Sequence, residues 1–409
     1  MTAPARVIRE YLDAHRDALL DLTTDLVRIE SHATQPEGVD AVGDRVCGEL
    51  EAAGYATTRA RGARVPPDRR WLEEVMMPGF DPARLADHRI ARKQGRGTGR
   101  VLLLGDLDTA FLPGTTSRFA FHVEGDRALG PGIADMKGGL AVMAYALKAL
   151  EATGLAAPGE IVILLSADEQ AGSLTARPVI EAEARGADWA FCLECARDGG
   201  NLMGARAQIG AGRLGVEGRT AHAGSAYQKG VSAIQAMAHK VLAIHALTDP
   251  AREVYLCVGQ IQGGWRRTAV PGHCTATLDV RTPSAAVWAE IEAKLGEIAG
   301  RVDLAGAAAT LRLASHRPAL PWTPDTDRLI GIAREAGAEL GCAFGVARSY
   351  AAGSSAFVGP LGIPCLDGMG PAGGDLMTDQ EHIVVATLAE RAALLATILA
   401  KLGAGAWTR

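Results

Sequence analysis

The sequence predicts an α/β protein with a mostly parallel sheet, covered by helices on both faces, and a smaller α+β domain inserted into it. The 409 residues exceed the roughly 250–300 at which a single core usually stops growing, so we expect two domains. Apolar runs such as "RVLLLGDL" (100–107) lack polar alternation, which is typical of strands buried on both faces. These runs alternate with helical patterns, as in chains that build parallel sheets.

The first part of the chain accounts for most of this sheet. We expect, in chain order, helices near 1–20 and 42–54, a strand over 54–60, strands over 100–107, 160–169 and 188–195, and a helix over 136–153. The segment 61–100 is rich in proline, arginine and glycine and is too long for an ordinary connection. It is interpreted as a functional insertion or a surface excursion.

The pattern changes near residue 207 and predicts a β-α-β-β-α-β unit, which is a ferredoxin-like arrangement. Its expected elements are a strand to 216, a helix over 229–247, strands over 253–262 and 273–281, a helix over 285–300 and a strand over 308–313. A helix over 325–341 then returns the chain to the first domain. We therefore predict a catalytic domain of residues 1–204 and 317–409, with a lid domain of residues 205–316 inserted between them.

Composition narrows the class of protein. There are 42 Lys and Arg residues against 47 Asp and Glu, a net charge of −5, and no basic block, so nucleic acid is not expected as a partner. No stretch approaches the ~18 uninterrupted apolar residues of a membrane span. The first twenty residues carry charges throughout and lack the apolar core of a signal peptide, which predicts a cytoplasmic protein. Seven scattered cysteines favour reduced thiols over a disulfide framework.

Acidic side chains follow three of the predicted buried strands. Asp106 and Asp108 end or follow the first, Asp168 and Glu169 follow the second, and Glu194 follows the third. In parallel α/β sheets, ligands bind where the carboxyl ends of the strands meet. The sequence therefore predicts a site built from carboxylates at one edge of the sheet.

Seven motifs lie in order along nearly the whole chain: "GDLDT" (105–109), "GPGIADMKGG" (130–139), "SADEQAGS" (166–173), "LEC" (193–195), "GRTAHAG" (218–224), "LDVR" (278–281) and "DGMGPAGGDLMTDQEH" (367–382). Together they resemble the zinc-exopeptidase-type family that includes glutamate carboxypeptidase, aminoacylase and the ArgE/DapE-like amidohydrolases. The resemblance implies a catalytic α/β domain with an inserted lid and a dinuclear zinc centre.

The resemblance also assigns roles to matching residues. Asp135 matches the aspartate that bridges the two zinc ions, and Glu194 matches an acidic zinc ligand. Glu169 matches the general base, and Asp108 matches the orienting aspartate. Asp108 and Glu169 are therefore expected to be catalytic residues.

Three family metal ligands are replaced, which predicts an atypical, degenerate metal site. Asp106 stands where the family has its first histidine, Gln170 where it has a glutamate, and Met377 where it has the last histidine. An amide and a thioether are poor zinc ligands, so no dinuclear zinc centre is expected. Gln170 and Met377 then become candidate substrate contacts.

The remaining set of possible ligands consists of Asp106, Asp135 and Glu194. An all-oxygen set suits one hard divalent cation such as Mg²⁺ or Mn²⁺ better than zinc. Aspartate is shorter than histidine, so the alternative is a site without metal. In that case the crowded carboxylates raise one another's pKa values, and Asp106 becomes a further catalytic candidate as a general acid.

Further candidates lie in the lid and in the return segment. His222 matches a histidine that, in the family, reaches the partner subunit's active site and stabilises an oxyanion, which implies a homodimer formed through the lid. Arg281 matches an arginine that binds the substrate carboxylate. Thr268 replaces a family asparagine, and "AAGSSAF" (351–357), which contains Ser354, lacks a family aspartate; both places are expected to contact substrate.

The leading hypothesis is an enzyme that acts on an amide or related C–N bond of a small, carboxylate-bearing, amino-acid-like or peptide-like substrate. Glu169 and neighbouring carboxylates supply the acid and base. Loss of a metal-bound hydroxide opens transfer, condensation and elimination besides hydrolysis. The alternatives are a single-metal amidohydrolase or carboxypeptidase, and a non-catalytic binding homologue.

Overall fold

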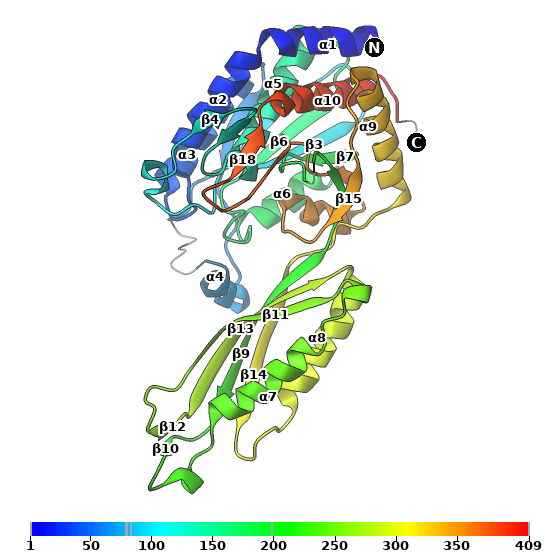
Figure 1. Ribbon diagram of the computed structural model, residues 1–409. Helices are drawn as coiled ribbons and strands as arrows, with labels where there is room; N and C mark the ends of the chain where they lie inside the picture. The colour runs from blue at the N-terminus through cyan, green and yellow to red at the C-terminus, as the bar shows by residue number, and fades with distance from the viewer. Residues whose placement is uncertain (1, 78–80, 82–83, 198, 408–409) are drawn as a thin grey trace.

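The computed structural model describes residues 2–77, 81, 84–197 and 199–407, and it places a large α/β domain next to an elongated lid (Figure 1). The helices of the large domain are α1 (Ala3–Ala14), α2 (Arg16–Arg28), α3 (Pro36–Ala52), α5 (Gly138–Ala152), α6 (Ala176–Ala184), α9 (Pro324–Leu340) and α10 (Ala386–Gly403). The single helix expected near 1–20 is therefore two helices, which meet at His15. Among the described residues, no helix combines the length and apolar composition needed to cross a membrane.

The main sheet has the strand order β1-β2-β6-β3-β7-β16. Its strands are β1 (Ala56–Ala60), β2 (His88–Gln94), β6 (Glu160–Ser166), β3 (Arg100–Asp106), β7 (Trp189–Cys192) and β16 (Cys365–Leu366). The pairs from β6 through β3 and β7 to β16 are parallel, whereas β1 and β2 are antiparallel to their neighbours. This confirms the predicted α/β class.

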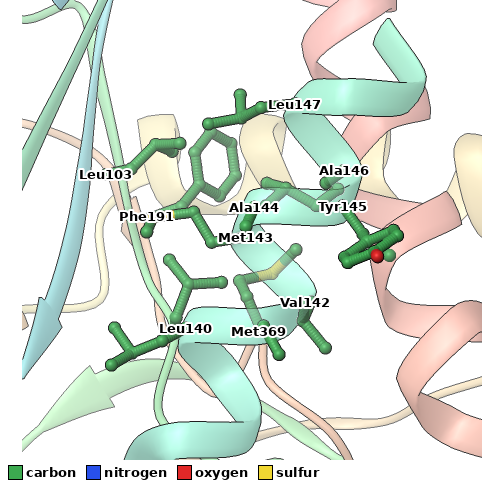
Figure 2. Close-up of a cluster of buried hydrophobic side chains, with 14 of the residues drawn as sticks. Leu103, Leu140, Val142, Met143, Ala144, Tyr145, Ala146, Leu147, Phe191 and Met369 are labelled. Carbon is green, nitrogen blue, oxygen red and sulfur yellow. The ribbon is translucent and has the colours of Figure 1, made fainter. Parts of the chain in front are cut away.

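The interior of strand β3, from Val101 to Leu104, is apolar because both faces of the strand are covered. Leu103 packs into the core formed with α5 and α10, whereas Leu102 and Leu104 pack into a second core with α6. Figure 2 shows Leu103 and Phe191 against side chains of α5. With both faces covered, the strand can present polar side chains only at its ends.

Helix α5 begins where it touches the end of β7. A Cβ atom on Gly139 would lie 1.9 Å from the carbonyl oxygen of Leu193, so glycine is required for this close approach. The approach brings the segment that contains Asp135 next to the residues that follow β7, Glu194 among them. Gly139 of the "DMKGG" motif therefore allows Asp135 and Glu194 to lie close enough for the charge of Asp135 to act on Glu194.

The lid is the expected α+β unit. It contains β9 (Gln208–Glu217), α7 (Ala233–His245), β11 (Tyr255–Gly263), β13 (His273–Thr282), α8 (Ala285–Gly300) and β14 (Ala308–Arg317), with strand order β11-β13-β9-β14. Alternate residues of β13 are buried in a core shared with the two helices. The lid thus has its own core and one open sheet face.

Shorter strands complete the chain: β4 (His122–Glu124), β5 (Arg127–Leu129), β8 (Leu202–Arg206), β10 (Ala221–His222), β12 (Ala269–Val270), β15 (Val346–Ser349), β17 (Gly373–Gly374) and β18 (His382–Val384). The β10–β12 ladder lies at the end of the lid remote from the large domain (Figure 1).

The interpretation of residues 61–100 as an insertion or surface excursion is wrong for part of the segment. Residues 88–94 form β2, which pairs with both β1 and β6, so this part is a strand of the main sheet and no excursion. Its charged residues hide the apolar pattern. Helix α4 (Trp71–Met76) does leave the domain, and Glu74 forms an ion pair with Arg213 of the lid at 2.8 Å.

Candidate functional site

The site begins at the carboxyl end of β3. Asp106 is the last residue of that strand and is 2% exposed. Its Oδ1 atom accepts hydrogen bonds from the hydroxyls of Ser166 (2.6 Å) and Ser354 (2.8 Å), and its buried Oδ2 atom has no hydrogen-bond partner. Burial, followed by the charges of Glu169 and Asp135, raises the pKa of Asp106 to about 8. This carboxyl group therefore holds its proton at neutral pH.

Asp108 organises the loop that carries the proposed base. Its two carboxylate oxygens accept hydrogen bonds from the backbone N–H groups of Glu169 and Gln170, both at 2.9 Å. Burial raises the pKa of Asp108, and the charge of Glu169 is the next largest cause. Asp168 has a similar local role, because it accepts hydrogen bonds from the backbone and hydroxyl of Thr175 just before α6.

Glu169 lies in this loop with its side chain 7% exposed. Its Oε1 atom is 2.7 Å from a guanidinium nitrogen of Arg317, which also donates to the carbonyl oxygen of Glu169. Arg317 is 1% exposed and lies over the ring of Phe357, with its guanidinium carbon 4.9 Å from the ring centroid. The carboxylate is thus held at one defined position by a buried cation.

Asp135 is held from two sides. The side-chain amide of Gln170 donates to Asp135 Oδ1 at 3.3 Å, and Glu381 accepts hydrogen bonds from the backbone N–H groups of Ala134 (2.9 Å) and Asp135 (3.2 Å). Burial and the charge of Glu169 raise the pKa of Asp135 to about 6. The pKa of Glu381 is raised to about 7, chiefly by burial.

Glu194 completes the cluster after β7. It is 3% exposed, and its Oε1 atom lies 3.9 Å from a guanidinium nitrogen of Arg206. The Nε atom of Arg206 donates to Asp367 at 2.6 Å. Burial raises the pKa of Glu194, with Asp135 as the next cause. The structure therefore brings together all five strand-end carboxylates that the sequence singled out, namely Asp106, Asp108, Asp168, Glu169 and Glu194.

Comparison with known proteins identifies the family. A model of peptidase family M20/M25/M40 matches residues 102–401, which is more than half of the chain. The protein belongs to this family. It is therefore an enzyme of the peptidase and amidohydrolase class, whose members act on amide bonds of peptide-like substrates.

Two curated relatives and one solved structure illustrate the similarity. The chain is 28% identical over 391 residues to carboxypeptidase G2 from Pseudomonas sp. (strain RS-16), covering 95% of this chain and 90% of that protein. It is 26% identical over 415 residues to a succinyl-diaminopimelate desuccinylase from Xanthomonas oryzae pv. oryzae (strain MAFF 311018), covering 94% and 98%. Aminopeptidase PepT from Bacillus cereus ATCC 10987 has the same fold, with a TM-score of 0.75, 20% identity and coverage of 95% and 98%.

The family resemblance implies two zinc ions, and two of the side chains that it places at ligand positions are Gln170 and Met377. Met377 is 58% exposed, and its backbone N–H donates to Glu381. Gln170 directs an N–H donor at Asp135, the residue expected to bridge the ions. In the described part of the chain, no group of three or more His, Cys, Asp or Glu side chains is arranged to hold a metal ion.

The predicted lid residues lie away from the carboxylates of their own chain. His222 belongs to β10 at the remote end of the lid, where its ring accepts hydrogen bonds from the backbone of Gly224 and Ser225. Thr268 is its neighbour, since its carbonyl oxygen accepts from Ala223. Arg281 is nearer the domain boundary, where it donates to Asp279 and to the carbonyl of Tyr350.

Sequence reasoning missed three charged residues of the site, namely Arg206, Arg317 and Glu381. Arg206 and Arg317 stand at the two boundaries of the lid, and the "LMGAR" context of Arg206 is otherwise small and apolar. An isolated charge in a buried strand is a signal for a buried ion pair. Glu381 lies four residues after Met377, in the motif that the sequence analysis already quoted.

Proposed function

We propose that this M20 enzyme acts on an amide or related C–N bond of a small, carboxylate-bearing, amino-acid-like or peptide-like substrate, and that it does so without a dinuclear zinc centre. The observation that carries the proposal is the pairing of Glu169 with Arg317 inside a carboxylate cluster whose family zinc ligands are replaced. The relatives named for carboxypeptidase and desuccinylase activities support a substrate of this class.

The chemistry follows from two differently placed carboxyl groups. Asp106, with its pKa raised to about 8, is protonated at neutral pH and can donate a proton. Glu169, ion-paired with Arg317, is the carboxylate that can accept one. With water as the acceptor this acid and base pair serves hydrolysis, and with an amine it serves acyl transfer; in both reactions the original amine leaves with a proton. The same pair can serve condensation, in which water leaves, or elimination, in which the base removes a proton as the leaving group departs.

A single-metal amidohydrolase is the second candidate function. The buried Oδ2 atom of Asp106 has no hydrogen-bond partner, and an orphaned carboxylate oxygen is a suitable ligand for one hard cation. Asp135 and Glu194 would be the other ligands. The nearby guanidinium group of Arg206 counts against it, because it already compensates the charge of Glu194.

We also propose that the enzyme is a cytoplasmic homodimer in which the lid of one subunit brings His222 to the cleft of the other. This accounts for the distance of His222 from the carboxylates of its own chain (Figure 1). Arg281 would bind the substrate carboxylate through its two-pronged guanidinium group.

The test is to purify the full chain in chelating buffer, measure its metal content, and assay it against N-acyl amino acids and dipeptides with and without hydroxylamine as an alternative acceptor. We expect fewer than two zinc ions per chain, turnover that survives chelation, and a loss of about 10²–10⁴ in kcat for Glu169→Gln. Glu10→Gln, which changes an exposed helix residue, is the control.

Each alternative gives a different result. Two tightly bound zinc ions, with turnover abolished by chelation, would refute the proposal. One bound Mg²⁺ or Mn²⁺ per chain, needed for turnover, would favour the single-metal enzyme. Ligand binding without turnover, with affinity unchanged in Glu169→Gln, would indicate a binding homologue.

A further inference from the structure

Each of the two chain segments that connect the catalytic domain to the lid carries a buried arginine. Arg206 is the last residue of β8, just before β9, and Arg317 is the last residue of β14. Both side chains are 1% exposed. The backbone of Arg206 exchanges hydrogen bonds with Leu320 at 3.0 and 3.1 Å, so the two connections lie side by side.

Arg317 binds the loop of the proposed base at three points. Its guanidinium group donates to Glu169 Oε1, to the carbonyl oxygen of Glu169 and to the carbonyl oxygen of Gly172. The ring of Phe357 covers the guanidinium group. A planar group with several donors can fix both the side chain and the backbone of one residue in this way, whereas an ammonium group cannot.

Arg206 performs the corresponding function on the other side of the cluster. It donates to Asp367 and Ser355 through Nε, and to the carbonyl oxygens of Ala351 and Ala352 through Nη1. Its Nη2 atom, buried and without a hydrogen-bond partner, lies 3.9 Å from Glu194.

Buried charges are normally paired or bound to metal, because an isolated ion in a protein interior is costly. In the part of the chain that the structure describes, the ion pairs to the carboxylates of the cluster come from these two arginines: Arg317 to Glu169, and Arg206 to Glu194 and Asp367. Together with Arg197, whose charge lowers the pKa of Asp135, these arginines are positive charge that the chain itself supplies to the site.

We propose that Arg206 and Arg317 are positioning residues that supply the cationic charge of this site, the charge that metal ions supply in two-metal sites. The inference rests on the proposed function, and it adds a structural consequence. Arg206 ends the strand that leads into the lid, and Arg317 ends the strand that leads out of it. The two connections between the lid and the catalytic domain therefore carry the positive charge of the site.

The first test is a pair of double-mutant cycles for thermal unfolding of the full chain in chelating buffer: Arg317→Met with Glu169→Gln, and Arg206→Met with Asp367→Asn, because Asp367 is the carboxylate nearest to Arg206. Removing one partner of a buried pair leaves an uncompensated charge, so each arginine variant should lower Tm by about 5 °C or more. Each double variant should recover at least half of that loss. Arg213→Met, which removes an exposed lid arginine paired with Glu74, is the control and should change Tm by about 1 °C or less.

The second test uses Mn²⁺ as a probe. Without the charge of Arg206, Glu194 and Asp367 should attract a cation, so Arg206→Met should bind Mn²⁺ at least tenfold more tightly than the unmodified protein. Arg206→Lys keeps the charge and should bind Mn²⁺ as the unmodified protein does. The readout is the free Mn²⁺ signal in electron paramagnetic resonance, which does not depend on a known substrate.

Double variants no more stable than the single arginine variants, or equal Mn²⁺ affinities in Arg206→Met and the unmodified protein, would overturn the inference. If Arg206→Met does not fold, the inference requires that Arg206→Met/Asp367→Asn does fold, and failure of both counts against it. Tight binding of two zinc ions by the unmodified protein would instead refute the proposed function. Absence of coupling in a protein without bound metal would refute this inference alone.

Discussion

Replacing Asp106 with asparagine should stabilise the metal-free protein at neutral pH. The side chain is buried, its pKa is raised from 3.8 to about 8, and Oδ2 has no hydrogen-bond partner. Asparagine has nearly the same shape and stays neutral at every pH. Its amide oxygen can still accept the hydrogen bonds that Ser166 and Ser354 now donate to Oδ1.

The magnitude follows from the linkage between proton binding and folding. Between pH 4 and 8 the folded protein keeps the proton of Asp106 while the unfolded chain has lost it, so stability falls as pH rises. One pKa unit corresponds to about 1.4 kcal/mol, and the group therefore costs about 4 kcal/mol at pH 7 and about 2 kcal/mol at pH 5. Asp106→Asn avoids this cost, so its advantage should grow by about 2–3 kcal/mol between these pH values.

The assay is urea unfolding of both proteins in chelating buffer at pH 5, 6, 7 and 8. Asp379→Asn, which changes an exposed carboxylate, is the matched control. An advantage for Asp106→Asn that stays constant or shrinks from pH 5 to pH 8 would refute the reasoning. If added Mg²⁺ or Mn²⁺ stabilises the unmodified protein and does not stabilise Asp106→Asn, Asp106 is a metal ligand.

Three further predictions concern the lid and the core. Arg281→Lys should raise KM about tenfold with little change in kcat, because an ammonium group cannot bind a carboxylate at two points. Steady-state kinetics measures both constants. If neither changes, Arg281 does not bind the substrate. His222→Ala should lower kcat without changing the dimer, as measured by turnover and sedimentation. If the unmodified protein is strictly monomeric and fully active, His222 has no role in a partner's cleft. Phe191→Ala should cost about 3–5 kcal/mol of unfolding free energy, because Phe191 is completely buried beside α5 (Figure 2), and a loss below about 1 kcal/mol in urea would contradict that packing.

The strands and most carboxylates of the site could be predicted because their signals are local. The run from Val101 to Leu104 has no polar residue, and this property follows directly from burial on both faces. Asp106 and Glu169 could be placed at one edge because parallel strands end together. The strand over residues 88–94 was not predicted, because His88 and Arg89 are buried although residues of these types are usually exposed.

The two arginines could not be predicted because their partners are distant in sequence. Arg317 pairs with Glu169 across 148 positions, and Arg206 pairs with Asp367 across 161. No periodicity within a helix or strand encodes such a pairing. The sequence offers only the weaker signal of a charge in a buried context, and tertiary structure is needed to name its partner.

Backbone hydrogen bonds explain how the metal ligands of an M20 site can change while its shape persists. Asp108 binds the N–H groups of the loop that contains Glu169, and Glu381 binds those of Ala134 and Asp135. These contacts fix the loops through atoms that every residue possesses, so they do not depend on which side chains bind metal. A substitution at position 170 can then change the charge and the hydrogen-bond donors of the site without moving the backbone around it. Under the proposed function, in which the site holds no dinuclear zinc centre, the arginine pairs supply the positive charge that its buried carboxylates require.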